Sequence, residues 1–459
     1  MTQASPETTS HTQPFANLHG VLICPNSPSY LWPLAREHTP FELIRDESDG
    51  LSPLARSIRA IRPCCDAPLI IAASGDMAPH IRQHIAENAL LADDDYQLLI
   101  EPHPRGGALT LALAAATVRL ADPHAILLCL PVTVAFDNDV RWEQALRRAY
   151  QAAEAGHIAL IGSSVSPLAP PVEESRQGHV AQTASPARGA VFDLLSTAYE
   201  STRSASYGAP PTDARARGAA RGNTRGNTRG RFETQEHETG QSLPLLGTIR
   251  TGTELRGLEG AFAVHSFIAR PTPALAWRAQ QNKALWSSHI FMLGADLALA
   301  ELRATGTESN DPLAHSVQRI AETARFFVSL GSEHWKSREA GELVGTLPAI
   351  SFEEAVFETT AHLAAVPTSI PFTDVRTLAD YEQSVEPDAK GNRLRGRALA
   401  VQTRNSTALA DGGKLVVTLG LEDVVVIDTP DATLVAAKDA LAQIPSVTAT
   451  LRTNNAPEL

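Results

Sequence analysis

The sequence predicts an α/β protein: a doubly wound domain, in which strands alternate with helices, followed by a smaller β-rich domain. From Gly20 onward, short apolar runs alternate with segments of helical periodicity, and after Gly391 Gly-rich turns separate short β-branched runs. The apolar runs of the first part are continuous, which is typical of strands that helices cover on both faces. In such a domain a binding site is expected at the carboxyl ends of the strands.

Five strands and two helices of the first domain follow from their residue patterns. A buried helix is expected over 109–120, a segment that is apolar nearly all round. An amphipathic helix is expected to start at the polar cluster 137–139 and to end at Gly156, because Trp142 and the alanine and leucine residues after it form one stripe. The predicted strands cover residues 21–24, 69–72, 97–100, 126–130 and 157–161.

The overall composition is that of a soluble globular protein, with 459 residues of which 43% are hydrophobic and 20% are charged. The net charge of −12 argues against nucleic acid or an anionic membrane surface as the partner of the whole chain. No apolar run is long enough to cross a bilayer, and the first 19 residues contain no apolar stretch typical of a signal peptide. The spacing of the four cysteines indicates buried thiols rather than a zinc site or a disulfide framework, so we expect a cytoplasmic protein.

Composition also divides the chain into a disordered polar tail over 1–19, the α/β domain over 20–390 and the β-rich domain over 391–459. An insertion over about 170–242 interrupts the α/β domain, and between residues 203 and 231 it holds seven arginines and one acidic residue. Such a segment buries too little apolar surface to fold, so we expect disorder. An Arg-Gly tract can bind RNA or another phosphate-rich partner; a solvated insertion without a dedicated ligand is the alternative.

The C-terminal domain is expected to contain strands at 414–418 and 423–428 and a helical segment at 432–443. Alternating apolar positions on these elements predict the surface that docks on the α/β domain. The predicted docking residues are Leu415, Val417, Leu419, Val424, Val426 and Leu434.

Several segments resemble, in the right order, the motifs of mannose-1-phosphate guanylyltransferases. Residues 31–37 resemble the LWPLSRE element of that family, and 419–439 read almost as the family does. The other matches are 101–108 to EPxGRNTA, 127–134 to the strand ending in LPADH, 267–271 to FVEKP, 285–291 to LWNSGMF, 351–356 to SIDYAVMEK and 370–378 to GWSDVGSW. The resemblance implies a Rossmann-like nucleotidyltransferase domain and a C-terminal left-handed β-helix that packs on it and assists assembly.

The resemblance also implies the candidate site residues. Glu101 and Arg105 lie in the element that contacts the nucleotide, and Arg270 takes the place of a lysine that contacts the sugar. Asp374 matches one of the two aspartates that hold Mg²⁺ in the family, whereas Thr133 replaces the other. In the match to LWNSGMF the glycine has become histidine, and Glu353 stands where SIDYAVMEK has its aspartate.

The phosphate-binding loop departs from the family pattern. Pro25, Asn26 and Pro28 replace three glycines, Tyr30 replaces the arginine and Phe41 the lysine. Proline offers no N–H to a phosphate, and neither aromatic residue carries a positive charge. Arginine contacts on transferring phosphoryl groups can be worth about 10³–10⁵ in rate, so we assign a catalytic role to no residue of this chain.

These observations predict a diverged, catalytically silent family member that acts as a binding or regulatory subunit in GDP-mannose metabolism. Its expected ligands are GTP or GDP-mannose, and its expected assembly is a homo-oligomer or a hetero-oligomer with an active paralogue. The first alternative is an active, Mg²⁺-dependent enzyme that converts GTP and mannose-1-phosphate into GDP-mannose and pyrophosphate. The second alternative is an interaction module that acts through the Arg-Gly insertion.

Overall fold

The computed structural model describes residues 15–25, 30–36, 39–46, 49–101, 105–136, 138–165, 246–307, 312–331 and 337–459. All of the described residues belong to a single compact unit. The predicted insertion at 170–242 lies outside the described residues, and so does most of the predicted tail. Within the described part of the chain, no helix is both long enough and apolar enough to cross a membrane.

A nine-stranded sheet forms the centre of the α/β domain, with the strand order β3-β2-β1-β4-β9-β6-β10-β8-β7. All five predicted strands are present, as β1, β2, β3, β4 and β6. The bounds of the nine strands are Leu18–Ile23 (β1), Leu69–Ser74 (β2), Tyr96–Glu101 (β3), Ile126–Pro131 (β4), Ile158–Ser163 (β6), Thr248–Glu254 (β7), Phe262–Ile268 (β8), Leu285–Gly294 (β9) and Leu363–Thr368 (β10).

The sheet is mixed rather than wholly parallel. Strands β1 to β4 pair in parallel, but β9 enters between β4 and β6 and runs antiparallel to both, and β7 and β8 form an antiparallel pair. The folded chain also begins before the expected boundary at residue 20. Strand β1 starts at Leu18, and the ring of Phe15 stacks on Tyr150 with a centroid distance of 4.8 Å.

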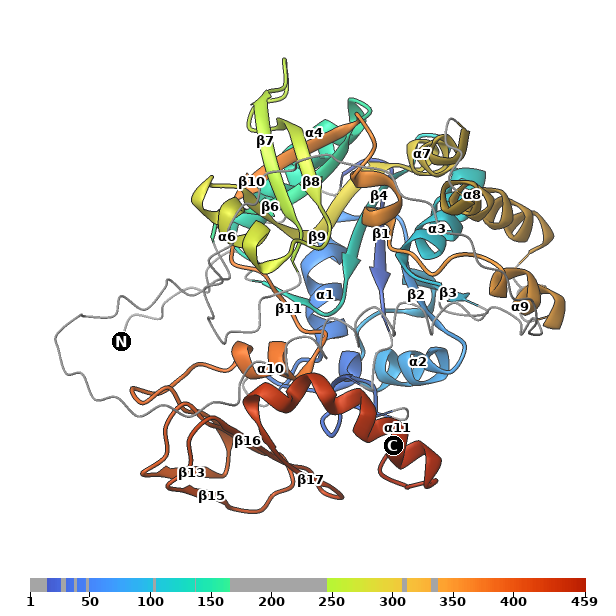
Figure 1. Ribbon diagram of the computed structural model, residues 1–459. Coiled ribbons are helices and arrows are strands. Elements are labelled where there is room, and N and C mark those ends of the chain that lie inside the picture. Colours follow the sequence, from blue (N-terminus) through green and yellow to red (C-terminus); the bar gives the residue numbers. More distant parts are fainter. Residues whose placement is uncertain are drawn as a thin grey trace, which may run out of the picture. The chain divides into compact units, whose positions relative to one another are not determined.

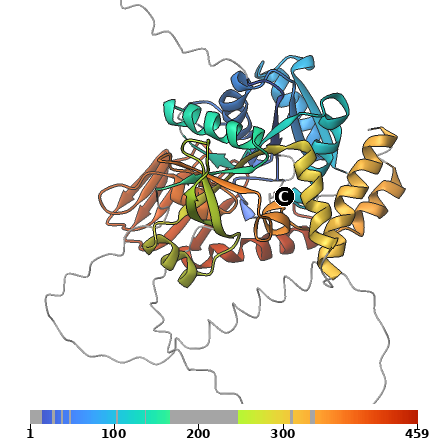
Figure 2. The ribbon, with the colours of Figure 1, turned by 90° about the horizontal axis from the view of Figure 1, so that it is seen from above.

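Helices cover both faces of the sheet, as the continuous apolar strands predicted (Figure 1). Helices α3 (Gly107–Ala121), α7 (Ala295–Thr307), α8 (Pro312–Leu330) and α9 (Arg338–Gly345) pack on one face, and α7 and α8 lie side by side in Figures 1 and 2. Helices α1 (Pro53–Ile61), α2 (Met77–Glu87) and α4 (Val140–Glu154) pack on the other. The remaining elements are α6 (Pro273–Gln281) and the short turns η2 (Phe41–Leu43), η3 (Arg62–Cys64), η4 (Asp93–Asp95) and η6 (Glu353–Phe357).

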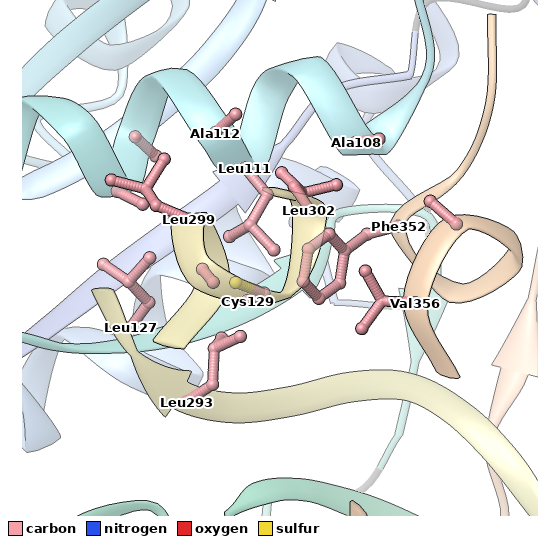
Figure 3. Close-up of a cluster of buried hydrophobic side chains, with 14 of the residues drawn as sticks. Ala108, Leu111, Ala112, Leu127, Cys129, Leu293, Leu299, Leu302, Phe352 and Val356 are labelled. Carbon is pink, nitrogen blue, oxygen red and sulfur yellow. The ribbon is translucent and has the colours of Figure 1, made fainter. Parts of the chain in front are cut away.

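Both predicted helices are confirmed. Helix α3 is buried over most of its length, and its side chains meet those of β4, β9, α7 and η6 in the core (Figure 3). Helix α4 begins after Asp139, whose carboxylate accepts a hydrogen bond from the backbone N–H of Arg141, and Gly156 follows it with φ +86°. The labelled core residues of Figure 3 are Ala108, Leu111, Ala112, Leu127, Cys129, Leu293, Leu299, Leu302, Phe352 and Val356.

The four cysteines are free and buried, in agreement with the interpretation as inert thiols. Burial raises the pKa of Cys65 to about 12 and that of Cys64 to about 11. A thiol becomes nucleophilic through its thiolate, which these pKa values suppress at neutral pH.

The C-terminal domain is a β-rich coil of short strands. Strands β12, β14 and β16 pair in parallel in one sheet, β13 and β15 pair in parallel in a second, and the chain alternates between the two sheets. Strand β17 closes the first sheet by antiparallel pairing with β16. The bounds are Arg393–Gly396 (β12), Ala398–Val401 (β13), Thr407–Ala410 (β14), Val416–Leu419 (β15), Val424–Asp428 (β16) and Thr433–Ala437 (β17).

The helical segment predicted at 432–443 was wrong in its first half. Residues 433–437 form β17, because pairing with β16 supplies them with hydrogen bonds that a helix would otherwise provide within itself. A 3₁₀ turn, η7 (Lys438–Gln443), and helix α11 (Ile444–Thr453) follow.

Residues 31–34, the LWPL part of the element that resembles LWPLSRE, contact the C-terminal domain. Leu31 and Trp32 are 2% and 8% exposed and pack in one cluster with Val425 and Ile427 of β16 and with residues of α10 (Leu378–Ser384). The docking residues predicted on β15 were wrong: Val417 and its neighbours Leu415 and Leu419 are more than half exposed. On β16 the docking cluster contains Val425 and Ile427 instead of the predicted Val424 and Val426, because alternation alone does not say which side of a strand faces its partner. Leu434 packs against this cluster, as predicted.

Candidate functional site

The two positions that correspond to the metal aspartates of the resembling family lie in contact. Strand β5 (Val134–Ala135), just beyond the carboxyl end of β4, pairs in antiparallel fashion with β11 (Thr373–Asp374). The hydroxyl of Thr133 donates a hydrogen bond to Oδ1 of Asp374 at 2.7 Å. Residues 241 positions apart in the sequence thus meet at the end of the sheet where a site was expected.

A guanidinium group engages the other oxygen of Asp374. Nε of Arg376 lies 2.5 Å from Oδ2 of Asp374, whose side chain is 6% exposed, whereas the side chain of Arg376 is 43% exposed. Burial of its inner part would lower the pKa of Arg376, but the carboxylates of Asp374 and Glu353 outweigh this and raise it. Arg376 is therefore a permanent cation that pairs with Asp374 while part of its side chain stays exposed.

His289 is buried beside this pair in an unusual backbone conformation. It lies in β9 with φ +60°, at the position of a family glycine, where the pairing of β9 with β6 is irregular. Its Nδ1 is 2.6 Å from Oε1 of Glu353, and its Nε2 has no hydrogen-bond partner and lies 3.8 Å from Oδ2 of Asp374. A left-handed conformation is uncommon for residues other than glycine and costs on the order of 1–3 kcal/mol, so the surrounding contacts must hold His289 in place.

Glu353 and Glu354 come from the π-helical turn η6. Oε1 of Glu354 pairs with Nε of Arg270 at 3.0 Å, and Arg270 is 62% exposed. Burial would raise the pKa of Glu353, but His289, Arg376 and Arg270 outweigh it and hold that pKa below its ordinary value. Glu353 is therefore an anion that contacts His289 and is stabilised by the positive charges of Arg376 and Arg270.

The residues of this cluster do not fit a magnesium ion. Magnesium is usually held by one or two carboxylates together with phosphate and water oxygens. Here Thr133 supplies no charge, and the two oxygens of Asp374 are engaged by the Thr133 hydroxyl and by Arg376. Among the described residues there is also no group of three or more His, Cys, Asp or Glu side chains that could hold a metal ion.

Glu101 and Arg105, the predicted nucleotide contacts, have partners inside the protein. Glu101 ends β3, is 7% exposed and accepts a hydrogen bond from the hydroxyl of Thr110 in α3. Nη2 of Arg105 donates to the carbonyl of Gly345 at 2.6 Å, at the C-terminus of α9, where a cation is favourable. The carbonyl of Ile350 accepts from the N–H of Ala108 at 3.2 Å and so engages an amide at the start of α3.

The structure therefore brings Asp374 and Arg270 to the same cluster, around Glu353, and gives Glu101 and Arg105 structural contacts. The sequence reasoning singled out neither Arg376 nor the pair of His289 and Glu353. A signal was present, since histidine replaced a family glycine and glutamate replaced a family aspartate. Those two changes lie 64 residues apart, and nothing in the sequence says that the side chains touch.

Comparisons with known proteins agree with the motif analysis. Residues 396–451 match the family described as MannoseP isomerase/GMP-like beta-helix domain. The chain is 24% identical to alginate biosynthesis protein AlgA of Pseudomonas aeruginosa, covering 93% of this chain and 70% of that protein. It is 23% identical to mannose-1-phosphate guanylyltransferase of Escherichia coli, covering 94% of this chain and 73% of that protein.

A solved structure shows the same fold. The crystal structure titled mannose-1-phosphate geranyltransferase from Thermus thermophilus superposes with a TM-score of 0.64 and 18% identity, covering 95% of this chain and 99% of that one. The relatives span the α/β domain and the C-terminal domain together, and the family match identifies the latter by itself. The chain is thus similar over most of its length to mannose-1-phosphate guanylyltransferases, and its C-terminal domain matches the MannoseP isomerase/GMP-like beta-helix family.

Proposed function

We propose that this protein binds a nucleotide or nucleotide sugar of GDP-mannose metabolism without catalysing nucleotidyl transfer. One observation carries the proposal: the carboxylate of Asp374, the remaining metal position, is engaged by Thr133 and Arg376. Nucleotidyl transfer requires strong stabilisation of the charge on the phosphates, and metal ions and positively charged side chains are the usual means.

The described residues around the former phosphate loop support the same reading. Tyr30, at the position of the family arginine, is 49% exposed. Phe41, at the position of the family lysine, packs edge-on against the ring of Tyr381 with a centroid distance of 5.8 Å. Phe41 thus serves packing near the C-terminal domain, and neither residue offers charge to a triphosphate.

Binding a nucleotide sugar requires less stabilisation of phosphate charge than transferring a nucleotidyl group does. Two arginines of the cluster can supply positive charge for such binding. Arg270 and Arg376 are each anchored by one carboxylate and each keep part of the side chain in solvent. Arginine recognises phosphate oxygens through two parallel N–H donors, which suits the diphosphate of a nucleotide sugar. A role as a binding or regulatory subunit, alone or beside an active relative, follows from binding without turnover.

The test is a pyrophosphate-release assay with GTP, mannose-1-phosphate and Mg²⁺, run beside an active mannose-1-phosphate guanylyltransferase as a positive control. We expect no release above background and a rise in melting temperature with GDP-mannose. Turnover at about 1–10³ s⁻¹, abolished by Asp374→Ala, would instead establish the active enzyme as the correct alternative. Absence of both turnover and binding would refute the binding role.

A further inference from the structure

We propose that Arg376 takes the place of the divalent metal ion, so that the site binds the phosphates of its ligand without a metal. This inference rests on the proposed binding function and names how that binding works. The first argument is a balance of charge. Two carboxylates and a divalent cation sum to zero, and so do the neutral Thr133, the anionic Asp374 and the cationic Arg376. Threonine at position 133 removes one negative charge, and the positive charge of Arg376 balances the one that remains on Asp374.

The second argument is the space around Asp374. The hydroxyl of Thr133 contacts one oxygen, Nε of Arg376 contacts the other, and Nε2 of His289 lies 3.8 Å from that second oxygen. A histidine now stands where the family has a glycine, and its side chain is only 7% exposed. A metal ion at Asp374 would therefore compete with a guanidinium that is already bound and would lie beside a like charge.

The third argument is the direction of the remaining charge. Arg376 is anchored through Nε, while its side chain remains 43% exposed, and Arg270 is anchored on Glu354 and is 62% exposed. Short contacts link the two groups: Arg376 pairs with Asp374, His289 lies against both Asp374 and Glu353, and the next residue, Glu354, pairs with Arg270. Two arginines that are each held by a carboxylate and partly exposed can offer parallel N–H donors to the oxygens of a diphosphate.

Two measurements test the inference. The first is calorimetric titration with GDP-mannose in EDTA and in MgCl₂. We expect equal affinity in both, and a loss of roughly tenfold or more in Arg376→Gln, as for one charge-assisted hydrogen bond. Arg338→Gln is the matched control, because Arg338 is 88% exposed and pairs with Glu342 of the same helix. The affinity of this variant for GDP-mannose should equal that of the wild type. GDP-mannose binding that requires Mg²⁺ would overturn the inference and leave the proposed function standing.

The second measurement is direct binding of Mn²⁺ in the absence of nucleotide, which is detected as a loss of the EPR signal of the free ion. We expect none for the wild type and saturable binding for Thr133→Asp/Arg376→Gln, which restores two carboxylates and removes the guanidinium. Saturable Mn²⁺ binding by the wild type would overturn the inference. Circular dichroism reports whether the double variant folds; if it does not, the comparison of EDTA with MgCl₂ on the wild type decides. No binding of GDP-mannose in either buffer would refute the proposed function itself.

Discussion

Glu101 provides a quantitative test, because burial changes its ionisation. It is 7% exposed and accepts a hydrogen bond from Thr110. Burial raises its pKa from 4.5 to about 7, although the Thr110 hydrogen bond pulls it the other way. The folded-state pKa is thus higher than the unfolded one. The folded protein binds the proton more tightly, so stability is lost as pH rises from 4.5 through 7.

The size of this loss follows from the two pKa values. Each pH unit between them corresponds to about 1.4 kcal/mol, so ionising Glu101 costs on the order of 3 kcal/mol of unfolding free energy by pH 8. Glu101→Gln stays neutral at every pH, and its amide oxygen can still accept from Thr110. The amide NH₂ group can add a constant cost, which does not depend on pH.

The assay is urea unfolding of the wild type and of Glu101→Gln at pH 5 and pH 8. Between these two values the wild type should lose on the order of 3 kcal/mol more than the variant. Glu342→Gln is the control, because the side chain of Glu342 is 66% exposed. The unfolding free energy of this variant should depend on pH as that of the wild type does. Parallel pH profiles for Glu101→Gln and the wild type would refute the reasoning that this carboxyl is desolvated.

Two further predictions concern packing and strain. Ile427→Ala should cost about 2–5 kcal/mol of unfolding free energy, because Ile427 is fully buried against the α/β domain. Leu419→Ala is the control: the side chain is 65% exposed, so the unfolding free energy should change by less than about 0.5 kcal/mol. Equal losses for the two variants in urea unfolding would contradict the observed docking face. His289→Gly should relieve the strain of the left-handed backbone but leave the Glu353 carboxylate without its partner at 2.6 Å, so we expect a net loss of unfolding free energy. His289→Asn should lose less, because asparagine tolerates φ > 0 and keeps a hydrogen-bond donor. A His289→Gly variant more stable than the wild type in the same assay would show that strain outweighs the ion pair.

Local pattern was sufficient for the elements whose hydrogen bonds and apolar stripe lie within one segment. Helix α4 has its cap, its stripe from Trp142 onward and its terminating glycine within 18 residues, so the sequence predicted its start and end. Continuous apolar runs predicted β2 and β4 for the same reason. The resemblance to a family added the order of the elements and the nature of the C-terminal domain, which the comparisons confirm.

Tertiary structure decided what depends on which distant segment lies alongside. Residues 433–437 have a pattern compatible with a helix and become β17 only because β16 is beside them. The site follows the same rule: Thr133 and Asp374 meet through the pairing of β5 with β11, and neither position in the sequence specifies that contact. The sequence, through its resemblance to the family, indicated that Thr133 stands at the position of an expected metal-binding aspartate, because the identity of one residue can be read directly. Only the fold decided that Arg376 compensates for it, because a charge acts through distance in space and not along the chain.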